Sequence, residues 1–285
     1  MSGKRETLKK IVLKIEDGMD PRDVLCTTYQ MRNFYKQMHD GFFSVLDIMN
    51  YIQHHQIVKW CKNGSEVLDV CCGRGLLLPM LRYQRKDIKG YTGVDIKKEN
   101  ATFMRSRVTD GKELSEDYYP FPVSFVQSNV ARMAKKLDKK FDFIVYTSAI
   151  EHMNKDHGVV SLQQCFKLLT KKGRLILTCP NTPEERSGYD TQYKAHVYEW
   201  KRSELITELD KAGFEVLHEY GVLISRKDLM QAVAGTQLED TITKISEFIP
   251  SEWLLPVFAP LFPSVSKEIG FVCKRKEKGL FSKKG

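Results

Sequence analysis

Short apolar runs alternate along the chain with longer segments in which apolar residues recur at helical spacing. The runs are rich in valine, isoleucine and phenylalanine, and several stop at an aspartate, an asparagine or a glycine. Apolar runs of this length are typical of strands buried on both faces, as in a parallel sheet covered by helices. The pattern therefore predicts an α/β fold with an open, mostly parallel sheet. The expected strands begin at residues 66, 90, 123, 141, 174, 214 and 269.

The same pattern divides the chain into five parts. Residues 1–60 have a helical period and many aromatic side chains, and they predict an N-terminal helical lid. Residues 61–223 hold all the expected strands except the last and form the core. A helical, proline-rich insertion, the last strand and a basic tail follow at residues 224–265, 266–275 and 276–285.

Composition limits the class of protein more than it specifies a function. Hydrophobic residues make up 42% of the 285 residues, enough for a folded core, and no apolar run is long enough to span a bilayer. The seven cysteines show no CxxC spacing, so we expect neither a disulfide framework nor a zinc site, and a cytoplasmic location. The net charge of +9 keeps an anionic partner such as nucleic acid open, although part of this charge lies in the tail.

The first expected strand ends in the segment EVLDVCCGRG, residues 66–75. A strand, a glycine turn and a helix in this order hold nucleotide-like ligands at the switch point of an open α/β sheet. Gly73 and Gly75 let the backbone approach the ligand, because a Cβ would occupy the same space. Asp69 would repel a pyrophosphate, but it suits a ligand with a positive group such as an α-ammonium.

A second acid stands at the end of the next strand. Asp95 lies 20 residues after Gly75, about the offset at which a carboxylate accepts hydrogen bonds from the hydroxyls of a ribose. With this pairing the chain resembles the class I S-adenosylmethionine (SAM) dependent methyltransferases, with Cys71 at the family's first glycine. The resemblance implies a Rossmann-like seven-stranded sheet with helices on both faces, and SAM as the methyl donor.

The resemblance also implies which residues contact SAM. Asn129, after the third strand, would accept a hydrogen bond from the adenine amino group, and the Val130 N–H would face the ring. The simpler alternative is that Asn129 only ends its strand in a turn. The carboxyl end of the fourth strand faces the transferred methyl group in the family. The expected cofactor-binding residues are Asp69, Cys71, Gly73, Gly75, Leu76, Asp95, Ile96, Asn129, Val130 and Thr147.

Candidate catalytic residues follow the fourth strand. Glu151 and His152 are similar to the Glu-His pair of ubiquinone-type O-methyltransferases, and His196 is the third candidate. An acceptor that must lose a proton needs a base, which a histidine or a carboxylate can supply. The structural alternative is that Glu151 caps the following helix and His196 packs within its loop.

His196 begins the segment HVYEW, which partly resembles a motif of plant-type small-RNA 2′-O-methyltransferases. In that family, two glutamates and two histidines hold a divalent metal, and Glu151, His152 and His196 match three of these ligands. Ser148 replaces the first carboxylate. Two histidines with one carboxylate can still bind a metal, but with this departure we expect no metal, and His152 or His196 acting as a general base.

Together these features predict an enzyme that moves a methyl group from SAM to an oxygen or nitrogen of a small-molecule acceptor, yielding S-adenosylhomocysteine. The aromatic lid and the apolar insertion suit a closed pocket for such an acceptor. Two alternatives stay open. One is a nucleic-acid methyltransferase acting on the RNA ribose 2′-oxygen or the cap guanine-N7, and the other is a SAM-binding regulatory subunit without turnover. The oligomeric state stays open as well.

Overall fold

The computed structural model describes residues 45–84, 87–107 and 119–277. The chain divides into two compact units, residues 1–44 and 45–285, and the first unit lies outside the described residues. Most of the expected N-terminal lid and most of the basic tail therefore lie outside them as well. The fold below is that of the second unit.

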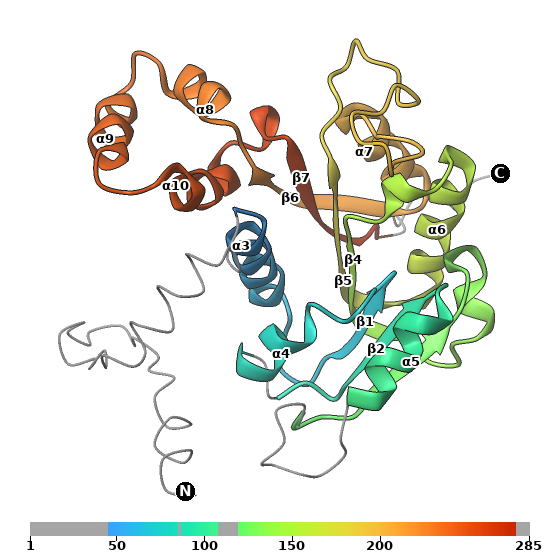
Figure 1. The fold of residues 1–285 in the computed structure, drawn as a ribbon. Coiled ribbons are helices and arrows are strands. Elements are labelled where there is room, and N and C mark those ends of the chain that lie inside the picture. Colours follow the sequence, from blue (N-terminus) through green and yellow to red (C-terminus); the bar gives the residue numbers. More distant parts are fainter. Residues whose placement is uncertain (1–44, 85–86, 108–118, 278–285) are drawn as a thin grey trace, which may run out of the picture. The chain divides into compact units, whose positions relative to one another are not determined.

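This unit is built on a seven-stranded sheet with the order β3-β2-β1-β4-β5-β7-β6 (Figure 1). The strands are β1 (Glu66–Val70), β2 (Gly90–Asp95), β3 (Val123–Gln127), β4 (Phe141–Thr147), β5 (Leu169–Pro180), β6 (Phe214–Leu223) and β7 (Glu268–Arg275). The first five pair in parallel, and β7 lies antiparallel between β5 and β6. The Rossmann-like, mostly parallel sheet expected from the sequence is confirmed.

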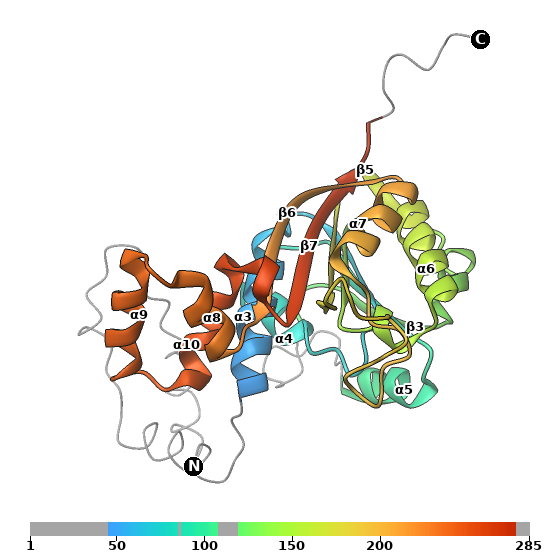
Figure 2. The ribbon, with the colours of Figure 1, turned by 90° about the horizontal axis from the view of Figure 1, so that it is seen from above.

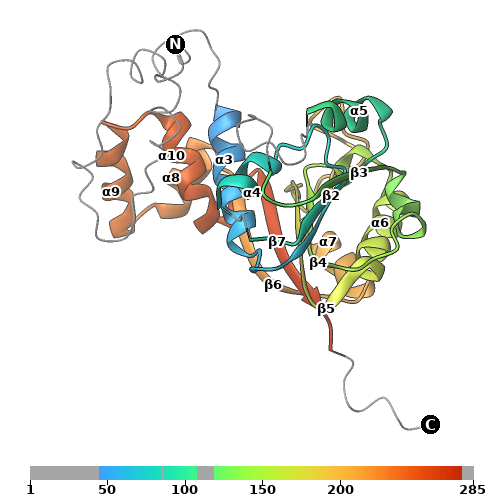
Figure 3. The same ribbon diagram turned by 90° about the horizontal axis from the view of Figure 1, so that it is seen from below.

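Helices cover both faces of the sheet. They are α3 (Val45–Lys59), α4 (Leu78–Gln84), α5 (Lys98–Arg107), η2 (Val130–Lys135), η3 (Ile150–His152), α6 (Lys155–Leu168) and α7 (Arg202–Lys211), where η marks a 3₁₀ helix. One core cluster joins one face to α6, α7 and η2, and a second joins the other face to α3, α4 and α5 (Figures 1 and 3). The central strands β1 and β4 contribute to both clusters, because successive side chains point to opposite faces. Their apolar runs without alternation follow from this position.

Two local details differ from what the sequence suggests. Serine is a preferred N-cap residue, so the sequence predicts that Ser203 caps α7. Ser203 instead lies inside that helix, and the N-cap is Lys201, which makes no capping side-chain bond. The Ser203 hydroxyl instead donates to the Glu184 carboxylate, which reaches the helix start from the preceding loop. The sequence predicts a turn at Lys172 and Gly173 that leads into the fifth strand, but β5 starts at Leu169, so Gly173 lies within the strand. Local propensity was overridden here by contacts with neighbouring segments.

The insertion between β6 and β7 is helical, with its own small apolar core. It contains α8 (Arg226–Val233), α9 (Gln237–Ser246), α10 (Ser251–Phe258), η4 (Ala259–Leu261) and η5 (Pro263–Val265). Figure 2 shows these helices beside α3, and α10 contacts α3 directly. The insertion returns the chain to the sheet at Glu268, beside Leu223 of β6.

Gly221 in β6 allows this close packing. A Cβ at Gly221 would overlap the Ala259 carbonyl oxygen and the Ser266 hydroxyl. We expect Gly221→Ala to lower the free energy of unfolding by about 2–3 kcal/mol, toward the upper end of overpacking costs in other cores. Gly235→Ala is the matched control, because Gly235 has a φ of 74° but nothing within 4 Å of a Cβ. It should cost only ~1 kcal/mol of backbone strain. Urea unfolding measures both, and equal costs would contradict the packing argument.

Candidate active site

The carboxyl ends of β1, β2, β3 and β4 meet at one edge of the sheet. The strand order places β1 and β4 side by side, with β2 and β3 beyond β1 and β5 beyond β4. The connections therefore diverge between β1 and β4, and open α/β sheets bind ligands in the crevice that this divergence creates. The candidate residues of the sequence lie at or just after the carboxyl ends of these strands, or in the loop after β5.

The turn after β1 contains three residues in the left-handed backbone region. The φ angles of Cys71, Gly73 and Gly75 are 57°, 53° and 74°. Glycine adopts this region without strain, whereas a cysteine pays for it. Cys71, where the resemblance predicts a glycine, thus has a backbone conformation that favours glycine. A Cβ at Gly73 would meet nothing within 4 Å, so this residue borders open space.

Two carboxylates flank this turn. The backbone N–H of Gly73 donates to Asp95 over 2.9 Å, and that of Lys97 does so over 2.8 Å, so Asp95 ties the turn to the end of β2. Asp69 is 5% exposed and accepts a hydrogen bond of 2.6 Å from the Tyr91 hydroxyl. Burial raises the pKa of Asp69 to about 7, although the Tyr91 bond counteracts this. A cationic ligand group would therefore find a buried acid with few partners.

Two hollows open along this edge. The smaller, of about 210 Å³, lies between the turn and α3, and the larger, of about 760 Å³, lies beyond Asp95. Nine of the ten expected cofactor-binding residues line one or both of them: Asp69, Cys71, Gly73, Leu76, Asp95, Ile96, Asn129, Val130 and Thr147. Gly75 does not; it bonds to Cys72 and packs near Met104.

Asn129 has a structural role in addition to its place in the larger hollow. Its side-chain oxygen accepts a hydrogen bond from Ala131 N and so caps η2. The simpler alternative for Asn129 thus describes a bond that is present, and the contact with adenine stays a prediction. Asn50, Gln53 and His54 of α3 also line the smaller hollow. Burial lowers the pKa of the half-buried His54 to about 4, so its imidazole is neutral at pH 7.

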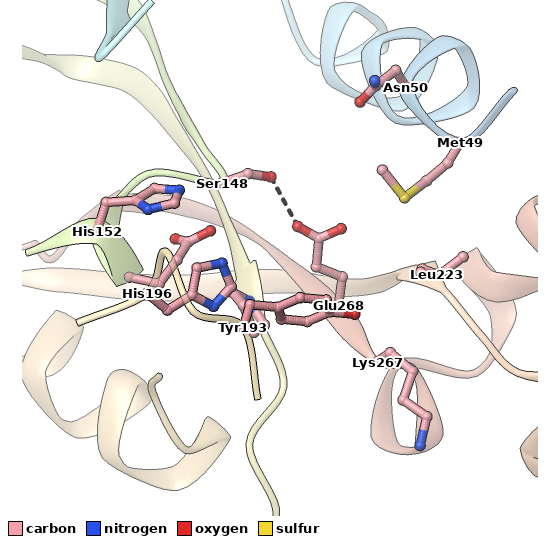
Figure 4. Close-up of a pocket in the computed structure, with 11 residues that line it drawn as sticks. Met49, Asn50, Ser148, His152, Tyr193, His196, Leu223, Lys267 and Glu268 are labelled. Atoms are coloured by element: carbon pink, nitrogen blue, oxygen red, sulfur yellow. Dashed lines mark hydrogen bonds between the residues drawn. The ribbon is translucent and has the colours of Figure 1, made fainter. Parts of the chain in front are cut away.

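A third hollow of about 310 Å³ adjoins the other two at Ser148, which lines all three. Ser148 has a φ of 44°, and its N–H bonds to Thr178 of β5. Its hydroxyl donates to the Glu268 carboxylate over 2.8 Å (Figure 4). The other lining residues are Met49, Asn50, Glu151, His152, Pro180, Tyr193, His196, Leu223 and Lys267.

The two candidate histidines meet in this hollow, with ring centroids 5.0 Å apart. His152 Nδ1 lies 3.0 Å from the Ala195 carbonyl oxygen, and His196 Nδ1 lies 2.7 Å from a Glu199 oxygen. Both partners are acceptors, so each Nδ1 carries the proton and each Nε2 keeps its lone pair in the neutral ring. Glu199 is 1% exposed and also accepts from Arg186. A buried carboxylate therefore orients His196, as an acid orients a catalytic base or a metal ligand.

Glu151 joins the turn after β4 to the loop after β5. Its carbonyl oxygen accepts hydrogen bonds from the N–H groups of Val197 and Tyr198, which brings the loop after β5 against the turn after β4. Its side chain is 1% exposed, and one carboxylate oxygen has no partner among the described residues. Burial, together with the nearby Glu268 and Glu199 charges, raises the pKa of Glu151 to about 8. Asn154 caps α6, so Glu151 is not the helix cap that the structural alternative assumed.

Comparison with known proteins agrees with this arrangement. Residues 52–219 match the family model described as a methyltransferase domain. The chain belongs to this methyltransferase family. It is 22% identical over 204 residues to the ubiquinone biosynthesis O-methyltransferase of Aliivibrio fischeri, covering 70% of this chain and 76% of that protein.

Solved structures show the same fold. A SAM-dependent methyltransferase from Clostridium acetobutylicum aligns with a TM-score of 0.52 and 10% identity, covering 87% of this chain and 99% of that one. One from Archaeoglobus fulgidus aligns with a TM-score of 0.51 and 17% identity, covering 85% and 99%. The methyltransferase therefore uses SAM as its methyl donor, as the sequence predicts.

The residues around the first two hollows fit SAM. Asp69 can pair with the α-ammonium, and Asp95 keeps lone pairs for ribose hydroxyls beyond the two N–H groups that it already accepts. The open space at Gly73 leaves room for the ligand beside the turn. The two acids match the positive charge of a sulfonium amino acid better than the negative charge of a dinucleotide.

The methyltransferase also has one group of described residues that could hold a metal ion. Single ligand atoms of Glu151, His152 and His196 all lie within 4.8 Å of one another. The free Nε2 atoms and the unpartnered Glu151 oxygen are suitable ligands for a divalent cation. The expectation that this site works without a metal stays a prediction.

We expect Asp69→Asn to weaken SAM binding about 10–100-fold, because a charge-assisted hydrogen bond to the ammonium is lost. Isothermal titration with SAM measures this change. Asp138→Asn is the control, since Asp138 is exposed and lines none of the three hollows. A SAM affinity that is unchanged in Asp69→Asn would show that another group binds the ammonium.

Proposed function

We propose that this methyltransferase transfers the methyl group of SAM to an oxygen or nitrogen of a small-molecule acceptor, with S-adenosylhomocysteine as the other product. The observation that carries this proposal is the hollow of about 310 Å³ that adjoins the SAM hollows at Ser148. A cavity of this volume is near the lower end of small-ligand sites. Its wall combines apolar side chains, which can contact the body of a small molecule, with two oriented imidazoles, which can take its proton.

The chain's contribution to the reaction is orientation and proton removal. The sulfonium of the bound donor already activates the methyl group, so placing the acceptor in line supplies much of the rate. His196 acts as the base, because Glu199 holds its Nδ1–H and leaves Nε2 free to accept a proton. Glu199 also stabilises the imidazolium that forms. His152 has the same tautomer, fixed by a backbone carbonyl, and is the second candidate base.

The alternative of a nucleic-acid acceptor has less support. The acceptor hollow is lined by two acidic side chains, Glu151 and Glu268, and its lysine, Lys267, already pairs with Asp228, so the described lining offers little to bind a phosphate backbone. Basic residues line a separate hollow at the amino ends of the strands, where Lys62, Lys172 and Arg174 gather. The resemblance of the HVYEW segment to RNA methyltransferases is the argument that remains for nucleic acid.

Two observations bear on the location of the enzyme in the cell. No helix among the described residues is long and apolar enough to cross a membrane. The described cysteines are all free, which supports the proposal of a reducing, cytoplasmic location.

We expect His196→Ala to lower kcat by roughly 10²–10⁴-fold, the usual contribution of a general base. SAM affinity should stay nearly unchanged, because His196 does not line the SAM hollows. His55→Ala is the matched control, since His55 is exposed on α3 and lines none of the three hollows. Release of S-adenosylhomocysteine measures turnover, and full activity of His196→Ala would refute this assignment.

A labelling experiment separates the two acceptor classes. SAM with a tritiated methyl group is incubated with the enzyme and a cell extract, which is then separated into RNA, DNA and small molecules. We expect the label in the small-molecule fraction, because the acceptor hollow is small and acidic. Label in RNA that falls steeply with salt would instead establish the nucleic-acid alternative.

A further inference from the structure

The acceptor hollow contains two acidic side chains, and one of them, Glu268, was not predicted from the sequence. Glu268 is the first residue of β7, and the insertion separates it from the rest of the site along the chain. The Ser148 hydroxyl holds its carboxylate in the hollow, opposite the two histidines (Figure 4). Glu151 is the second carboxylate that lines this space. The hollow thus contains two acids contributed by distant parts of the chain.

No basic side chain of the described residues neutralises this pair. Lys267 lines the same hollow, but it pairs with Asp228 over 3.0 Å and points away from Glu268 in Figure 4. Arg186 is engaged by Glu199. The Glu151 oxygen without a partner belongs to a side chain that is 1% exposed, and a buried oxygen of this kind needs a hydrogen-bond donor or a cation beside it. A substrate with an N–H group can provide that donor.

The charge balance of methyl transfer then distinguishes nitrogen from oxygen. When an amine attacks, the N–C bond forms, the C–S bond breaks and its electron pair stays on sulfur, so the positive charge moves from sulfur to nitrogen. A positive charge beside the two acids favours their carboxylate forms, and these stabilise the charge as it arrives on nitrogen. A hydroxyl that first loses its proton becomes an anion, which the same carboxylates destabilise. An amine that binds as an ammonium has no lone pair, so it first gives one proton to an imidazole, which passes the proton to water, and the neutral amine then attacks.

We propose that the acceptor is an amine, and that Glu151 and Glu268 bind it and stabilise the positive charge on its nitrogen. The inference rests on the proposed function and narrows its acceptor to nitrogen. Glu268 is then the residue that determines the preference for an amine over a hydroxyl. The apolar lining from Met49, Pro180 and Leu223 suits an amine with a small hydrocarbon body.

The first experiment measures binding and requires no knowledge of the natural acceptor. Full-length enzyme saturated with S-adenosylhomocysteine is titrated at pH 7 with benzylamine and, separately, with benzyl alcohol. Both are small compared with the cavity of about 310 Å³, and they differ mainly in charge. We expect the amine to bind roughly tenfold more tightly, or better. Equal binding of the two compounds, or tighter binding of the alcohol, would overturn the inference.

The second experiment tests Glu268 itself. Glu268→Gln keeps the shape of the side chain and an oxygen for the Ser148 hydroxyl, but it removes the charge. We expect it to abolish most of the preference for benzylamine while SAM affinity and Tm stay at the wild-type values. Glu185→Gln makes the same change at an exposed loop position and should keep the preference. If Glu268→Gln keeps it as well, Glu268 does not bind the amine.

The third experiment identifies the methylated atom. SAM with a deuterated methyl group is incubated with the enzyme and a small-molecule extract, and the product is located by fragmentation in a mass spectrometer. An N-methyl product formed in the presence of EDTA supports the inference. An O-methyl product, or activity that EDTA abolishes and Mn²⁺ restores, would overturn it. If SAM binds but no labelled product forms, the proposed function fails, and the inference fails with it.

Discussion

The carbonyl oxygen of Glu151 is the point on which the acceptor site depends. It accepts hydrogen bonds from Val197 and Tyr198, and these N–H groups would lose their partner if the loop moved away. The loop carries His196 with its orienting Glu199, and it supplies the Ala195 carbonyl that fixes His152. One backbone oxygen after β4 therefore holds the loop whose Ala195 carbonyl and Glu199 carboxylate fix the tautomers of the two imidazoles.

Much of the donor site was predictable because its parts are local. The turn after β1, the acid at Asp95 and the end of β3 each follow an apolar strand, and parallel strands end at a common edge. Nine expected residues line the hollows there. Gly75 was expected among them, but it shapes the turn from behind, where Met104 packs. Sequence spacing indicates that a glycine is needed in a turn, not which side of the turn faces the ligand.

The acceptor site was only half predictable, because it depends on long-range packing. Glu151, His152 and His196 carry local signals, whereas Glu268 is one glutamate before an ordinary strand. Only the antiparallel pairing of β7 with β5 and β6 places it beside Ser148. Ser203 failed as a cap for a related reason, because Glu184 reached the helix start from another segment. The one signal for Glu268 was its place at the end of the insertion.

Ser148 lines all three hollows, and the parts of the chain on its two sides contribute differently to them. The expected donor-binding residues lie between Asp69 and Thr147, but the larger donor hollow is also lined by residues after Ser148, such as His152 and Val197. Leu223, Lys267 and Glu268, at the two ends of the insertion, line the acceptor hollow and neither of the donor hollows. Natural variation at these positions can therefore change what is methylated while the residues around the donor stay the same.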